Sequence, residues 1–215
     1  MGALNGALIH CTGINFFVLT LASGGMLRGI SLMITDGKPI TKFGKAFMQL
    51  GIGRIGEFQF PVLFALTLIL LSSPLMFHVK WGNYVQALGG SETALKRSGV
   101  RTGFYRISVH VFLGITAAVT AVIITARLNS AEPNAGMNME LDAITAVIMG
   151  GTPIRGGNAS IAGTVLAVLI LGIIRNGLTL LSVSSDFQQW VTGFLLLASV
   201  LISEIRVWNT RALIK

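Results

Sequence analysis

A stretch of 20 residues without a formal charge, residues 60 to 79, limits most strongly what this chain can fold into. As a helix rising about 1.5 Å per residue, it matches the roughly 30 Å hydrocarbon core of a bilayer. The composition agrees with a membrane setting, because 53% of the residues are hydrophobic and only 11% are charged. Such a chain has too little polar surface to cover a water-soluble core. We therefore predict one helical membrane domain over residues 1 to 215.

Four further stretches are long and apolar enough to cross a bilayer. They are residues 14 to 35, 107 to 126, 159 to 182 and 187 to 203. Two of the four contain a single charge, Arg28 in the first and Arg175 in the third, and the other two contain none. Together with residues 60 to 79, they predict five membrane spans.

A sixth apolar stretch, residues 141 to 157, starts as a helical pattern and is interrupted at Gly150, Gly151 and Pro153. An interrupted helix is tolerated at membrane depth only where protein or water satisfies its free backbone groups. We interpret this stretch as an interrupted crossing, with a re-entrant hairpin as the alternative. The predicted fold class is all-α, a polytopic transmembrane helical bundle with about six membrane segments, one of them broken.

The net charge of +8 is explained by membrane topology rather than by nucleic-acid binding, which the hydropathy argues against. Residues 80 to 106 hold five basic residues against one acid, Glu92, and basic connections stay in the cytoplasm. The loop at residues 127 to 140 then lies outside, and the basic C-terminal tail favours the cytoplasm. Residues 36 to 59 must also lie outside, although they hold four basic residues.

Motifs for catalysis and for nucleotide or metal binding are missing from the sequence. It contains no G-x-x-x-x-G-K-[ST] phosphate loop, no H-E-x-x-H and no G-x-S-x-G. The single cysteine, Cys11, excludes an intrachain disulfide, and the three histidines share no local spacing. We expect no enzyme activity, no catalytic residue, no cofactor and no metal site.

Polar side chains within or beside the apolar stretches form a candidate translocation path. They are Arg28, Asn134, Asp142, Thr152, Asn176, Ser184 and Gln188. A charge at bilayer depth is costly unless it is paired or hydrated, so Arg28 and Arg175 are expected either to line such a path or to extend to the interface. For Asp142 we prefer the capping of a helix N-terminus. The alternative for the uncharged residues is that they bridge neighbouring helices.

Two glycine pairs at four-residue spacing, Gly2/Gly6 and Gly25/Gly29, indicate helix packing. This spacing lets two helix backbones approach closely where lipid supplies no hydrophobic drive for association. We therefore expect both pairs at helix contacts, although the spacing is a weak signal for dimerisation.

The segment GGSETALKRSGV, residues 89 to 100, predicts a compact helical knob between two spans. Ser91 is the expected N-cap of a short helix, and Gly99 is the expected stop. A membrane subunit could press such a knob into the groove of a cytoplasmic partner. The alternative is that the short helix only connects the two spans.

These residues resemble the permease subunits of ribose-type ABC importers, which carry monosaccharides and related small polyols across bacterial inner membranes. The similarity covers nearly the whole chain. It is carried by residues 3 to 40, by WGNYVQALGGSETALKRSGV at 81 to 100, by residues 126 to 157 and by NGLTLLSVSSDFQQWVTG at 176 to 193. Members of this family have several spans before the position that matches residues 1 to 6. The resemblance therefore implies that this sequence lacks the N-terminal spans.

The resemblance also implies a set of partners and a coupling segment over residues 85 to 101. The expected ATPase-coupling residues are Gly89, Gly90, Ser91, Glu92, Ala94, Lys96, Arg97, Ser98 and Gly99. The implied partners are a cytoplasmic ATP-binding subunit, a periplasmic or lipid-anchored sugar-binding protein, a second permease copy (the same chain or a related one) and membrane lipid, with no nucleic acid. Two alternatives are a secondary transporter coupled to an ion gradient and an inactive membrane fragment.

Overall fold

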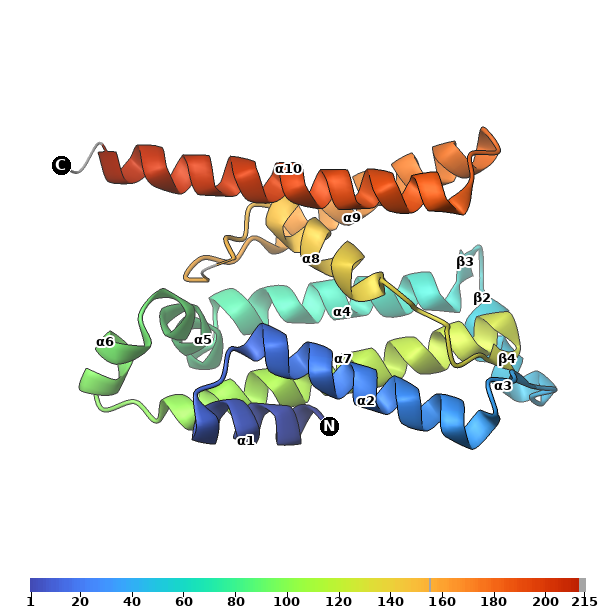
Figure 1. The fold of residues 1–215 in the computed structure, drawn as a ribbon, viewed down its shortest axis with the longest axis horizontal. Coiled ribbons are helices and arrows are strands. Elements are labelled where there is room, and N and C mark those ends of the chain that lie inside the picture. Colours follow the sequence, from blue (N-terminus) through green and yellow to red (C-terminus); the bar gives the residue numbers. More distant parts are fainter. Residues whose placement is uncertain (155, 213–215) are drawn as a thin grey trace. The chain divides into compact units, whose positions relative to one another are not determined.

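The computed structural model describes residues 1 to 154 and 156 to 212, so the end of the predicted cytoplasmic tail lies outside the described residues. The described chain is mostly helical (Figure 1). Its helices are α1 (Gly2–Thr12), α2 (Phe16–Thr35), α3 (Lys45–Ile52), α4 (Phe60–Phe77), α5 (Lys80–Gly90), α6 (Glu92–Arg97), α7 (Thr102–Leu128), α8 (Met139–Met149), α9 (Ile161–Leu180) and α10 (Ser185–Ala212). Four two-residue strands, β1 (Ile40–Thr41), β2 (Arg54–Ile55), β3 (Phe58–Gln59) and β4 (Ser130–Ala131), pair antiparallel as β1 with β4 and β2 with β3.

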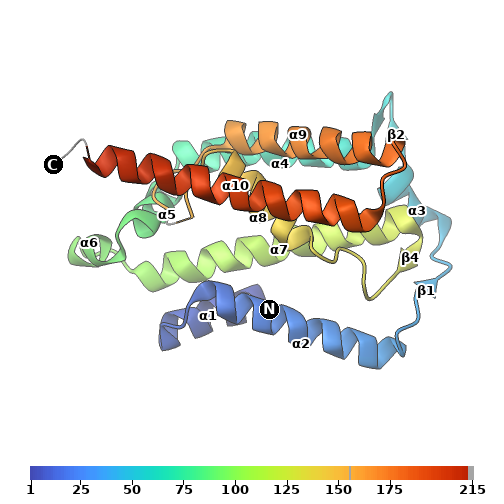
Figure 2. The same cartoon turned by 45° about the horizontal axis from the view of Figure 1, so that its top comes forward.

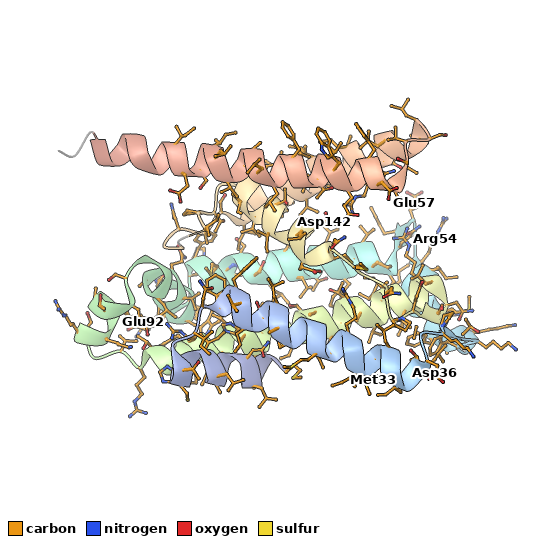
Figure 3. All side chains as sticks on the ribbon, viewed as in Figure 1. Met33, Asp36, Arg54, Glu57, Glu92 and Asp142 are labelled. Carbon is orange, nitrogen blue, oxygen red and sulfur yellow. The ribbon has the colours of Figure 1, made fainter. Side chains whose placement is uncertain are left out.

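Five of these helices are long and apolar enough to cross a membrane: α2, α4, α7, α9 and α10. They coincide with the five stretches expected from the sequence, so the predicted all-α polytopic bundle is confirmed. Their apolar side chains are largely exposed; Met33, for example, is 81% exposed and Leu180 is 78% exposed. Figure 3 shows the side chain of Met33 on the surface of α2. Apolar surface of this extent suits contact with lipid or with other helices.

The chain folds into two compact units. Unit 1 comprises Met1–Val85 and Thr93–Ala135, and unit 2 comprises Gln86–Glu92 and the residues from Gly136 onward. Residues 86 to 92 therefore belong to unit 2, although the chain on both sides of them belongs to unit 1.

The long helix α7 is the centre of unit 1. α1 contacts one end of it and α3 contacts the other end (Figure 2). At the second contact, Gly51 of α3 faces the backbone of Ala126 and Arg127, and Ala126 is fully buried. The contact depends on a glycine because a side chain at position 51 would occupy the place of the α7 backbone.

The glycine pair Gly2/Gly6 holds α1 against α7. A Cβ atom at Gly6 would lie 2.9 Å from the Cα of Ile107, and a Cβ atom at Gly2 would lie closer still to the backbone carbonyl of His110. The predicted close packing is confirmed for this pair, and it occurs within one chain. At Gly25 and Gly29, no described atom lies within 4 Å of the Cβ position, so the predicted contact of the second pair is not found in the described part of the chain.

Unit 2 is built on the interrupted segment. α8 contacts both α9 and α10, and it ends at Met149 after 11 residues, which is about 16 Å of helix and half of a bilayer core. The described residues from 150 to 160 contain no helix, so the predicted interruption at Gly150 is confirmed. We call residues 150 to 160 the α8–α9 connection.

Candidate functional site

An ion pair joins α8 and α9, the two helices that follow residues 127 to 140. Asp142 lies in the first turn of α8, and Arg175 lies near the end of α9. The Arg175 Nη2 atom donates to the Asp142 Oδ1 atom at 2.8 Å. Pairing lowers the cost of holding two charges within membrane-spanning helices, and a charged donor and acceptor at this distance make a strong hydrogen bond.

The capping role preferred for Asp142 is wrong. Asp142 does lie in the first turn of a helix, but the N-cap position of α8 is Asn138. The carboxylate of Asp142 instead accepts from Arg175, 33 residues away in the chain. The location near a helix N-terminus remains favourable for a negative charge, while the carboxylate accepts its hydrogen bond from the neighbouring helix α9. Figure 3 labels Asp142 on α8.

Side chains of α10 extend this ion pair into a polar network. Arg175 also donates to the hydroxyl of Thr192 at 3.4 Å, and that hydroxyl donates to the backbone carbonyl of Gln188 at 3.1 Å. The Gln188 amide donates to the carbonyl of Val183 at 3.1 Å and to the hydroxyl of Thr179 at 3.4 Å. Helices α8, α9 and α10 thus supply a carboxylate, a guanidinium, an amide and two hydroxyl groups to one network.

Two adjoining pockets open onto this network. They have volumes of about 330 Å³ and about 400 Å³. Both are lined by Met139, Asp142, Arg175, Gln188 and Thr192. Aliphatic residues of the three helices, among them Ala146, Val168, Leu171 and Leu195, form the remaining wall of the first pocket. An apolar wall with a few convergent polar groups, in a volume of 300 Å³ or somewhat more, is typical of small-molecule sites.

Only part of the predicted translocation path converges on these pockets. Asp142 and Gln188 line them together with Arg175. Asn176 and Ser184 belong to unit 2 but are exposed and line neither pocket. Thr152 lies in the α8–α9 connection, where its hydroxyl accepts from the backbone amide of Ser160 at 3.2 Å. Arg28 and Asn134 belong to unit 1, on α2 and in the turn after β4.

Thr192 was not among the predicted path residues. It lies in a charge-free span, where a threonine adds little to the hydropathy pattern. Its position four residues after Gln188 puts both side chains on one face of α10. That spacing is the signal from which its role could have been inferred.

The coupling segment comprises the second half of α5 and the whole of α6. α6 begins after Ser91 and ends before Gly99, which has a φ of +77°, so the predicted short helix and its stop are confirmed. α5, from Lys80 to Gly90, was not predicted; its Gly82 fits against the carbonyls at the end of α4.

The side chains of α6 divide between the interior and the surface. Leu95 is buried, with 8% of its surface exposed. Of the predicted ATPase-coupling residues, Glu92 is half-buried, whereas Ala94, Lys96, Arg97 and Ser98 are exposed. Gly89 and Gly90 end α5, and Ser91 separates the two helices. A short helix that anchors one leucine and presents basic side chains to solvent has the form expected of the predicted knob.

Five apolar spans, an interrupted membrane segment and a mostly apolar pocket of small-molecule size define a polytopic helical membrane protein. The sequence model of the family described as "Branched-chain amino acid transport system / permease component" matches residues 1–200, and the chain belongs to this family.

The chain is similar to several curated permeases. It is 37% identical over 206 residues to the ribose import permease protein RbsC of Escherichia coli (strain K12), an alignment that covers 94% of this chain and 64% of the relative. It is 38% identical over 200 residues to the ribose import permease protein RbsC of Bacillus subtilis (strain 168), covering 92% and 62%. It is 35% identical over 205 residues to the D-allose transport system permease protein AlsC of Escherichia coli (strain K12), covering 95% and 63%.

These comparisons confirm the resemblance to ribose-type permeases that the sequence motifs suggested. The chain spans about 64% of the length of the first of these relatives. No solved structure matches it significantly. Family and spans together make the chain a multi-pass protein of the bacterial inner membrane.

Proposed function

We propose that this chain is the membrane-spanning permease subunit of a bacterial ABC importer for a monosaccharide or a related small polyol. The observation that carries the proposal is the pocket around Asp142 and Arg175. A carboxylate accepts hydrogen bonds from hydroxyl groups and a guanidinium donates to them, while an amide does both. A polyhydroxylated solute matches this set better than a bare ion does.

The family names of the relatives support the same substrate class. The similar proteins are named for the import or transport of ribose, D-allose and L-arabinose. The sequences of this chain and of those permeases align through both the pocket helices and the coupling segment, since the matches cover 92% of this chain or more. From these names we take only the substrate class, a monosaccharide, for this chain, and no particular sugar.

The energy source in this proposal is a separate cytoplasmic ATP-binding subunit. The sequence has no phosphate-binding loop of its own, so ATP hydrolysis is assigned to the partner and the permease itself performs no catalysis. The ATP-binding subunit docks on the coupling segment at the exposed face of α6. A periplasmic or lipid-anchored binding protein delivers the sugar from the outside, and a second permease copy completes the pathway.

Transport follows by alternating access. Binding and hydrolysis of ATP in the partner displace the coupling segment, and the spans convert that displacement into opening toward one side of the membrane and then the other. Asp142, Arg175, Gln188 and Thr192 hold the solute between the two openings.

A second candidate function is a secondary transporter. The observation that favours it is the ion pair beside a half-length helix, because interrupted helices and intramembrane charges also form the ion sites of gradient-driven transporters. The two functions differ in the energy source: a gradient-driven transporter works without an ATP-binding subunit and stops when the proton or sodium gradient is dissipated.

The pocket is tested by replacing Thr192 with valine, which keeps the shape and removes the hydroxyl. In vesicles that contain the whole importer, we expect Thr192→Val to lower the apparent affinity for the sugar by roughly fivefold, the effect of losing about one hydrogen bond. Thr116→Val is the matched control, because the Thr116 hydroxyl donates only to carbonyls of its own helix. Equal uptake by both variants at limiting sugar would contradict the pocket as the sugar site.

A further inference from the structure

The end of α5 touches the α8–α9 connection backbone to backbone. A Cβ atom at Gly89 would lie 2.7 Å from the backbone nitrogen of Gly157 and 3.1 Å from the Cα of Gly156. A Cβ atom at Gly156 would in turn lie 2.8 Å from the Cα of Gly89. Distances this short are not seen for real Cβ atoms, so only glycine permits the contact. All three residues belong to unit 2.

The connection is tied to the ends of the two helices it joins. The amide of Thr152 donates to the carbonyl of Val147 in α8 at 3.2 Å, and the Thr152 hydroxyl accepts from the amide of Ser160 at 3.2 Å. Gly150 lies against the first turn of α9, where its Cβ would be 2.5 Å from the nitrogen of Thr164. The described contacts of the connection with α5, α8 and α9 are thus backbone contacts and hydrogen bonds.

Contacts of this kind leave little room for a displacement to be absorbed. A flexible side chain between two helices can change its rotamer when one helix moves, whereas two backbones in contact must move together or separate. Asp142 lies eight positions before Gly150, the C-cap of α8, which is about 12 Å along a rigid helix. A shift at the end of α5 therefore has a direct route to the carboxylate of the pocket.

We infer that Gly89 and the pair Gly156/Gly157 form a joint through which movement of the coupling segment is passed to α8 and its Asp142–Arg175 pocket. This inference rests on the proposed function, because it assumes that an ATP-binding subunit moves the coupling segment. It assigns a positioning role to these three glycines.

The neighbouring glycines provide matched controls. Gly90 also ends α5, but a Cβ there would meet the Cα of Gly157 at 3.7 Å, an ordinary contact. Gly89→Ala should therefore break the joint and Gly90→Ala should preserve it, with the same change in helix propensity. In the α8–α9 connection, Gly156 and Gly151 both have a positive φ, +78° and +93°. They differ in their surroundings, because nothing lies within 4 Å of a Cβ at Gly151. Gly151→Ala thus controls for backbone strain in Gly156→Ala.

The test uses a cysteine reporter in the pocket. The single native cysteine is replaced by Cys11→Ser, and Ala143→Cys places a thiol on α8 at the pocket wall. The importer is assembled with its ATP-binding subunit in vesicles, and the labelling rate by a membrane-impermeant maleimide is measured with and without ATP. ATP hydrolysis and retention of the ATP-binding subunit are measured on the same samples.

We expect ATP to change the labelling rate in the reporter protein and in its Gly151→Ala variant, and in Gly90→Ala when samples with equal retention of the ATP-binding subunit are compared. In Gly156→Ala the ATP-dependent change should shrink by about fivefold or more, the size of a typical coupling between sites, while ATP hydrolysis and subunit retention persist. In Gly89→Ala it should shrink as far when compared at equal retention of the ATP-binding subunit. A full ATP response in Gly89→Ala would overturn the joint. Failure of the unmutated reporter to bind the ATP-binding subunit or to respond to ATP would instead overturn the proposed function.

A measurement on the unmutated importer covers the case in which Gly89→Ala does not fold. Hydrogen exchange of the backbone amides is compared with and without ATP. The joint predicts that ATP alters exchange in residues 150 to 160 together with residues 86 to 92. A change confined to the coupling segment would contradict it.

Discussion

The ion pair between Asp142 and Arg175 gives a prediction that can be tested on the isolated chain. Asp142→Asn and Arg175→Gln each remove one charge, and the double variant removes both. At the observed separation of 2.8 Å, the attraction is about 6 kcal/mol at an effective dielectric constant of 20 and about 1.5 kcal/mol in water. The side chains are 26% and 51% exposed, so the net coupling lies toward the lower end, at about 2 kcal/mol.

This coupling is obtained from a double-mutant cycle of unfolding free energies. We expect each single variant to destabilise the protein by about 2–3 kcal/mol, because it leaves one charge unpaired, and the double variant to cost no more than about 3–4 kcal/mol. The assay is reversible unfolding in mixed detergent micelles, followed by tryptophan fluorescence. As a control, Asp186→Asn combined with Arg175→Gln should be additive, since no ion pair of Asp186 is found within the described residues. A coupling below about 0.5 kcal/mol for Asp142 and Arg175 would refute the pairing.

Three further predictions concern glycines and the coupling segment. Gly6→Val should destabilise the chain by about 1–3 kcal/mol, since its Cβ would press on Ile107. Gly25→Val should be close to neutral because no described atom lies near its Cβ position. Thermal unfolding in detergent compares the two variants. Gly99→Val should lower the free energy of unfolding by about 1–2 kcal/mol because of the positive φ at this position, and Gly99→Asn should lower it less. Equal stability of the two variants in the same unfolding assay would contradict this. Arg97→Ala should weaken binding of the ATP-binding subunit while membrane insertion stays normal, and unchanged co-purification would count against docking at α6.

The membrane spans could be predicted from the sequence because a charge-free run of about 20 residues has few alternatives to crossing a bilayer. The interruption after α8 was also predictable, since Gly150, Gly151 and Pro153 end a helix by local backbone chemistry. The short helices α3 and α5 were not predicted, and for α1 only the packing of its glycine pair was. They hold glycines that weaken a local helix signal, and their stability comes from contacts with α4 or α7.

The candidate site was predicted only in part. Ionisable residues within or beside spans are functional candidates by themselves, so Asp142 and Arg175 could be predicted, and Gln188 was predicted as an uncharged polar residue near a span end. Their partners could not be assigned, because residues 33 positions apart are joined only by the packing of α8 on α9. The contact of Gly89 with Gly156 could not be predicted for the same reason. A glycine in the sequence indicates a flexible or closely packed backbone, but it does not indicate which segment packs against it.

The most direct test of the proposed function is the energy source of uptake. The chain, its ATP-binding subunit, its binding protein and any second permease chain are reconstituted in liposomes, and entry of radiolabelled monosaccharides is measured. The proposal predicts uptake only when ATP and the ATP-binding subunit are present, with no loss when ionophores dissipate the proton and sodium gradients. Uptake that persists without the ATP-binding subunit and stops with an ionophore would contradict it and establish a gradient-driven transporter.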